Sequence, residues 1–155
     1  MRESTSKPKR KTAAERGSYA PALKAELERA SADLVYSSES DRPFEFFSIG
    51  YPGRRSPPDA EDFAALIGRD AGNGDGHIEE RSMVEFFAHH TATSDPYDSE
   101  AQKIRPRYEA LMRLLSTKLR DVKVYRVGKV EIECYVVGLD GNGNLAGLKT
   151  IALET

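Results

Sequence analysis

The hydrophobic and polar positions follow a helical period through most of the chain and a period of two near its end. The longest helical pattern has an apolar stripe made of Ile104, Tyr108, Leu111, Leu115 and Leu119. This stripe predicts an amphipathic helix over about 99–120. Pro106 lies inside the pattern, so the helix is expected either to kink there or to begin there.

Three shorter helices are predicted in the first hundred residues. Apolar residues spaced by three or four positions predict one helix over about 20–34 and another over 59–69. A third helix is expected to begin after Ser82, because Ser82 and Glu85 have the spacing of a capping box. It should end at His89-His90, since histidine suits the negative end of the helix dipole.

Three strand-like runs follow the long helix, over 122–127, 130–137 and 145–153. β-Branched and aromatic residues dominate the first two runs, and the second alternates between a more apolar and a more polar face. The segment 140–144 contains Gly and Asn, which tolerate the positive φ angles of a hairpin loop. With an earlier strand over 43–50, these elements predict an α+β or layered α/β/α protein whose sheet is covered on both faces.

The third run carries the chain to its last residues. We expect this strand to continue through Glu154 to Thr155, so that the sheet holds the terminal carboxylate at a fixed place. A negative charge fixed in this way is a candidate binding feature.

Two polar segments are predicted to be loops, 36–41 and 70–78. The second partly resembles a calcium-binding loop, but the matching register places Ala71 and Ser82 at the two end positions where carboxylate ligands are needed. A flexible Gly- and Asn-rich loop is therefore the preferred interpretation. His89-His90 is not expected to chelate a metal, because adjacent residues point in different directions on a helix.

The charge distribution separates a basic leader from an acidic body. Of 23 Lys and Arg residues, six lie in residues 1–16 with two of the 25 acidic residues, which leaves 17 basic and 23 acidic residues and a net charge of −6. Residues 1–17 are predicted to be a disordered tail, and 18–155 a single domain. The acidic body disfavours direct nucleic-acid binding and suits a basic protein partner.

The sequence contains no motif that indicates catalysis. There is no glycine-rich phosphate loop with lysine, nucleophile elbow, cysteine pair or His-Glu metal motif. Cys134 is the single cysteine and is expected to be a small buried hydrophobic residue. Glu131 and Glu133 share one strand face, which is interpreted as a solvated or helix-covered face. These features predict a protein that is not an enzyme, without cofactor, membrane span or signal peptide, and located in the cytoplasm.

Several strings of residues, in the same order, resemble the nuclease A inhibitor family. They are LVYSSES (34–40), PFE (43–45), FF (86–87), VYRVGKVE (124–131), YVVG (135–138), GNLAGL (143–148) and the final ET (154–155). The resemblance covers about 20–155 and is densest in the last third of the chain.

The resemblance implies a three-layer α/β/α sandwich similar to plant pathogenesis-related class 1 proteins, with a mostly antiparallel sheet. It also implies a monomer that binds, one to one, a sugar-non-specific DNA/RNA endonuclease of the ββα-metal type. Thr155, Glu39 and Asp95 match the family's contact residues, and Glu154 is part of the matching end. The Thr155 carboxylate would approach the nuclease metal through water. Pro96 stands where the family has an aromatic residue, and Tyr97 follows it.

Two other interpretations remain open. The same fold would serve as an acidic interaction domain retargeted to another nuclease or another basic protein. Alternatively, the chain is a small-ligand or metal-binding module that uses Asn73, Asp75 and His89-His90.

Overall fold

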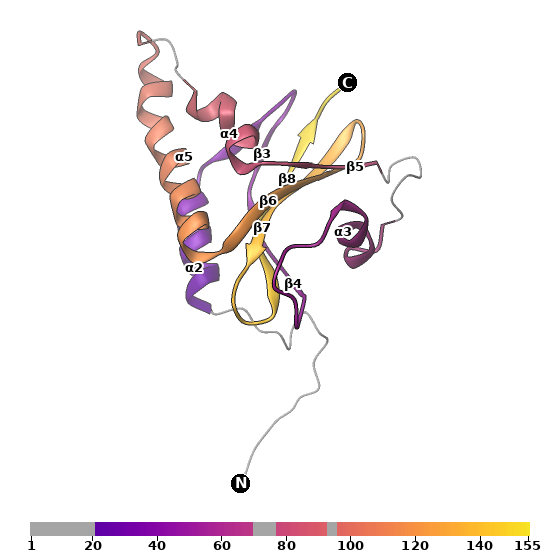
Figure 1. Cartoon of the computed structure of the whole chain (residues 1–155). Helices are drawn as coiled ribbons and strands as arrows, with labels where there is room; N and C mark the ends of the chain where they lie inside the picture. The colour runs from indigo at the N-terminus through magenta and orange to yellow at the C-terminus, as the bar shows by residue number, and fades with distance from the viewer. Residues whose placement is uncertain (1–20, 70–76, 93–95) are drawn as a thin grey trace.

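A five-stranded antiparallel sheet forms the centre of the computed structural model, which describes residues 21–69, 77–92 and 96–155 (Figure 1). The strand order across the sheet is β4-β8-β7-β6-β5, and every neighbouring pair is antiparallel. The strands are β4 (Glu45–Gly50), β5 (Ile78–Arg81), β6 (Arg120–Val127), β7 (Glu131–Leu139) and β8 (Asn144–Leu153). The three C-terminal runs predicted from sequence are therefore the three central strands.

The predicted hairpin loop between β7 and β8 is confirmed. Gly141 and Gly143 both have φ +85, a backbone region that glycine enters without steric cost. The Asp140 carboxylate accepts hydrogen bonds from the amides of Asn142 (2.7 Å) and Asn144 (3.1 Å). This turn fixes the register of the longest pair of strands.

Helices lie against both faces of the sheet. On one face, α2 (Pro21–Ser31), α4 (Met83–Thr91) and α5 (Ser99–Lys118) share a core with alternate residues of β6, β7 and β8. On the other face, α3 (Ala60–Leu66) buries Phe63 against Tyr125, with ring centroids 4.1 Å apart. The predicted α/β class with a mainly antiparallel sheet is confirmed. No helix in these described ranges is both long and apolar enough to cross a membrane.

Three helices differ in detail from their predictions. The first ends at Ser31 rather than near 34, because Asp33 takes a left-handed φ of 68 that a helix does not continue. The helix expected over 59–69 covers only Ala60–Leu66, and Gly68 beyond it has a left-handed φ of 78. The long helix does not begin at Pro106. It begins at Ser99, where the Asp98 side chain caps it, and continues through Pro106.

Three short strands were not predicted. The expected loop 36–41 forms instead a hairpin of β2 (Val35–Ser37) and β3 (Asp41–Pro43). The expected loop before the third helix ends in β5. The predicted strand 43–50 begins two residues later, at Glu45. The predicted tail 1–17 and most of the predicted loop 70–78 lie outside the described residues.

Candidate functional site

The C-terminus leaves the sheet before the chain ends. The strand was expected to reach Thr155, but β8 ends at Leu153. The Glu154 amide still donates a hydrogen bond to the carbonyl of Val130 (2.9 Å), just before β7. Apart from this bond, the last two residues are held by hydrogen bonds that involve side chains.

The turn of the β2–β3 hairpin lies beside the C-terminus and binds it from one side. One carboxylate oxygen of Glu39 accepts from the Thr155 amide (2.8 Å), and the other accepts from the Thr155 hydroxyl (2.7 Å). The Glu39 amide donates to the carbonyl of Leu153 (3.1 Å), and the Ser38 hydroxyl accepts from the Leu153 amide (2.9 Å). The hydrogen bonds from Thr155 lower the pKa of Glu39, so Glu39 is ionised at neutral pH.

Helix α4 holds that hairpin in place. The Tyr36 ring stacks on Phe86, with centroids 4.2 Å apart. His89 donates through Nε2 to the carbonyl of Ser37 (2.7 Å), and His90 accepts through Nε2 from the Ser37 amide (3.2 Å). Burial lowers the pKa of His90 to about 4, which leaves the ring neutral and able to accept.

The two histidines therefore hold the β2–β3 hairpin through hydrogen bonds to the backbone of Ser37. The predicted capping box of α4 is confirmed, with Ser82 and Glu85 each bonding the other's amide. Within the described ranges, no group of three or more His, Cys, Asp or Glu side chains could hold a metal ion. The Asn73 and Asp75 of the metal-binding interpretation lie outside those ranges.

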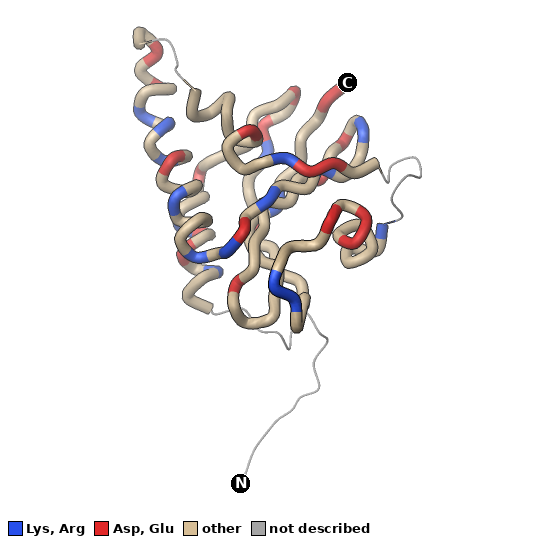
Figure 2. The backbone as a smooth tube through the Cα atoms, viewed as in Figure 1, with Lys and Arg blue, Asp and Glu red and all other residues tan. Residues whose placement is uncertain are grey.

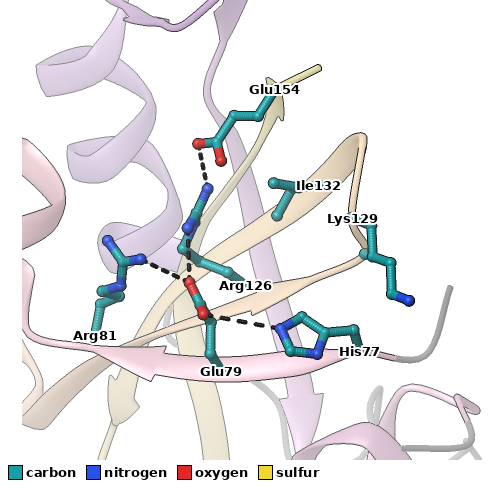
Figure 3. A pocket seen from close by; sticks show the side chains of 8 residues that line it. His77, Glu79, Arg81, Arg126, Lys129, Ile132 and Glu154 are labelled. Carbon is teal, nitrogen blue, oxygen red and sulfur yellow. Dashed lines mark hydrogen bonds and ion pairs between the residues drawn. The ribbon is translucent and has the colours of Figure 1, made fainter. Parts of the chain in front are cut away.

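A buried arginine binds the C-terminus from the opposite side. Arg126 on β6 is only 7% exposed and donates to Glu79 on β5 (2.7 Å) and to Glu154 (Figure 3). Glu79 also pairs with Arg81 (2.8 Å). Burial alone would raise the pKa of Glu79, but Arg126 and Arg81 lower it overall. The result is a continuous ion-pair chain from β5 to the last residues.

A hollow of about 390 Å³ opens beside this ion-pair chain. Its walls carry both signs of charge, and Glu154 forms part of its edge (Figure 3). The lining residues are His77, Glu79, Arg81, Arg126, Gly128, Lys129, Ile132 and Glu154. The hollow therefore offers charged contacts next to the C-terminus.

The candidate site residues are only partly brought together. Glu39 and Thr155 are in direct contact, and Glu154 adjoins them; Figure 2 shows the acidic hairpin turn next to the acidic chain end. Tyr97 is 91% exposed and lies just before α5. The first turn of α5 and the C-terminus lie at the same end of the molecule, at the top of Figure 1. Asp95 lies outside the described residues.

The expectation for Cys134 is confirmed, since it is fully buried and burial raises its thiol pKa to about 11. Glu133 lies on the sheet face that packs against α3, which agrees with the helix-covered alternative of its prediction. There it pairs with Arg69 (2.6 Å) and accepts a hydrogen bond from the Tyr135 hydroxyl (2.7 Å).

Sequence reasoning missed Arg126, although a signal was present. The period of two places Arg126 on the same strand face as Val122 and Val124, which face the larger core. A charge at a core-facing position requires a buried partner. The partner on β5 could not be identified, because that strand was itself not predicted.

The family model NuiA, described as nuclease A inhibitor-like protein, matches residues 21–155. No curated protein matches the chain. The matched range includes every helix and strand described above.

Proposed function

Because the chain belongs to the nuclease A inhibitor-like family, we propose that it inhibits a nuclease by presenting its terminal carboxylate to the catalytic cleft. The main support for this proposal is that Glu39 binds both the amide and the hydroxyl of Thr155. These two bonds fix the residue without using its terminal carboxylate. We extend the proposal to the family's fold, a three-layer sandwich like that of pathogenesis-related class 1 proteins.

The chemistry of a nuclease cleft suits such a ligand. The cleft holds a polyanionic backbone with a divalent metal and basic side chains. A carboxylate presents oxygens of the same charge sign as those of a phosphate, and a carboxylate fixed before binding loses little conformational entropy on binding. The proposed target is a sugar-non-specific nuclease of the ββα-metal type, with the Thr155 carboxylate near its metal through a water molecule.

The remaining contacts are proposed to lie around this terminus. Glu39, with its ionised carboxylate, would face basic side chains of the cleft while it holds Thr155. Tyr97 would add an exposed aromatic surface, and Asp95 and Glu154 would add charge. We propose a monomer that binds one nuclease molecule and itself catalyses nothing.

The first prediction tests the position of the carboxylate. Two glycines appended after Thr155 keep every side chain but move the terminal charge by two residues, about 6.6 Å along an extended chain. Inhibition of a metal-dependent, sugar-non-specific nuclease acting on DNA and on RNA should weaken more than tenfold, and the melting temperature should barely change.

The matched control is Thr155→Ser, which retains the carboxylate, the amide and the hydroxyl, and should inhibit nearly as well as the wild-type protein. Equal inhibition by the extended protein would show that the terminal carboxylate is not in the cleft. Failure of the wild-type protein to inhibit any nuclease of this type would overturn the proposed target.

A further inference from the structure

We infer that Arg126 is a positioning residue for the inhibitory terminus, an inference that rests on the function proposed above. Arg126 does not lie at the tip of the chain. Its guanidinium reaches Glu79 on β5 through Nη1 and Glu154 through Nη2, so it joins the edge strand to the penultimate residue.

The difference in burial between Arg126 and Glu154 indicates which residue holds the other in place. Its side chain is 8% exposed, whereas that of Glu154 is 49% exposed. The fixed partner is therefore the arginine on the central part of the sheet, and the partner that it orients is the glutamate on the chain end. The planar guanidinium bonds two separate carboxylates at defined angles, which a lysine ammonium would do less rigidly.

The two sides of the terminus are held independently. Glu39 binds Thr155 from the β2–β3 hairpin, and Arg126 binds Glu154 from β6. Neighbouring residues of an extended chain point in opposite directions. Holding one side chain on each side therefore restricts both sideways movement and rotation of the terminal carboxylate.

Removal of Arg126 would do more than delete a bond. Glu79 and Glu154 would remain close to each other without the positive charge between them, and like charges repel. Glu79 would still have Arg81, but Glu154 has only its backbone bond to Val130 among the other hydrogen bonds described above. The last two residues are therefore the part expected to move.

The chain provides a matched control. Arg69 and Glu133 form another Arg–Glu pair, with a 2.6 Å separation, on the face of the sheet that packs against α3. Like Arg126, Arg69 donates through a guanidinium nitrogen to a carboxylate that is accessible in part. The substitutions Arg126→Met and Arg69→Met remove the same functional group, but only the first one faces the C-terminus.

The experiment measures the terminus and the inhibition separately. Backbone ¹⁵N relaxation of Glu154 and Thr155 in the isolated protein should show increased fast motion in Arg126→Met and in Glu154→Gln, but not in Arg69→Met. Inhibition of the nuclease should weaken about tenfold in Arg126→Met, mainly through faster dissociation, and should not change in Arg69→Met.

Each outcome decides the inference. Unchanged relaxation of the last two residues in Arg126→Met overturns it, and so does increased motion with unchanged inhibition. If Arg126→Met does not fold, the exposed substitution Glu154→Gln decides by relaxation alone, because Glu154 is itself proposed to add charge to the interface. If the wild-type protein inhibits no nuclease, the proposed function fails on its own, while relaxation still shows whether Arg126 orders the terminus.

Discussion

Glu39 contacts Thr155, the residue that carries the terminal carboxylate, so two negative charges are neighbours in space. The pKa of Glu39 is lowered by its two bonds from Thr155, so its charge is present at neutral pH. Such a pair is unfavourable in isolation, because each charge disfavours the other. The hydrogen bonds from the uncharged Thr155 amide and hydroxyl to Glu39 oppose this repulsion, and both residues are exposed. In the proposed complex, a metal ion or a basic side chain of the nuclease would offset both charges.

The second prediction concerns His90 and acid. Its folded-state pKa is about 4 instead of the usual 6.5, because burial disfavours the charged ring. The folded protein thus binds fewer protons than the unfolded chain between these values. The corresponding stability is present above pH 6.5 and is lost as the pH falls toward 4, with a total of about 1–2 kcal/mol after allowance for partial solvent screening.

The substitution His90→Gln tests this dependence, because a glutamine oxygen can accept from the Ser37 amide but does not titrate. Thermal unfolding followed between pH 7 and pH 4.5 should show a smaller loss of stability in the variant than in the wild-type protein. Parallel pH profiles for the two proteins would contradict the assignment. At pH 7 the comparison measures the loss of the ring contacts of His90, which include stacking on Tyr108 with centroids 4.1 Å apart and edge contact with Tyr36.

The third prediction concerns the approach of β7 and β8 at Gly147. A Cβ atom built on Gly147 would lie 1.9 Å from the backbone oxygen of Val136. Backbone atoms of two central strands cannot move apart without breaking the ladder. Gly147→Ala should therefore destabilise the fold by about 3 kcal/mol or more in chemical denaturation.

A control separates steric contact from backbone conformation. Gly141 has φ +85, but a Cβ built on it meets no heavy atom within 4 Å. Gly141→Ala should cost only the left-handed conformation, about 1–2 kcal/mol. Equal losses for the two substitutions would mean that the close approach at Gly147 is relieved elsewhere in the sheet.

Elements with a strong local signal were predictable from sequence. The capping box at Ser82, the long apolar stripe of α5 and the alternation in β7 each specify a structure within one segment. The strands β2, β3 and β5 contain only three or four residues each, and β3 and β5 are rich in polar residues. They exist because a neighbouring strand pairs with them, and that information is not contained in the segment itself.

The candidate site was predictable only in its outline. Resemblance to the family selected Glu39 and Thr155, and the structure shows them in contact. The resemblance does not show how these residues are held in place. His90 bonds Ser37 across 53 positions of the sequence, and Arg126 bonds Glu154 across 28. Such contacts follow from the packing of α4 and the order of the strands, neither of which periodicity specifies.

The distribution of charge over the domain leads to the last prediction. The chain after residue 16 has a net charge of −6, while a nuclease cleft is basic. Opposite charges on two proteins accelerate their encounter. Salt screens this attraction beyond a Debye length of about 10 Å at 0.1 M ionic strength. Raising the ionic strength from low to physiological should slow association about tenfold, as measured by stopped-flow mixing, and should change dissociation much less.

Charge-removing variants would show which acidic residues produce the electrostatic attraction to the cleft. Glu39→Gln removes a charge next to the terminus, whereas Glu61→Gln with Asp62→Asn removes two charges from the first turn of α3, on the other face of the sheet. Because screening shortens the reach of each charge, the first change should reduce the salt dependence of the association rate more than the second, although it removes fewer charges. A salt-independent association rate in the wild-type protein would indicate a mainly apolar interface, and the carboxylates at the C-terminus would then not be the groups that meet the cleft first.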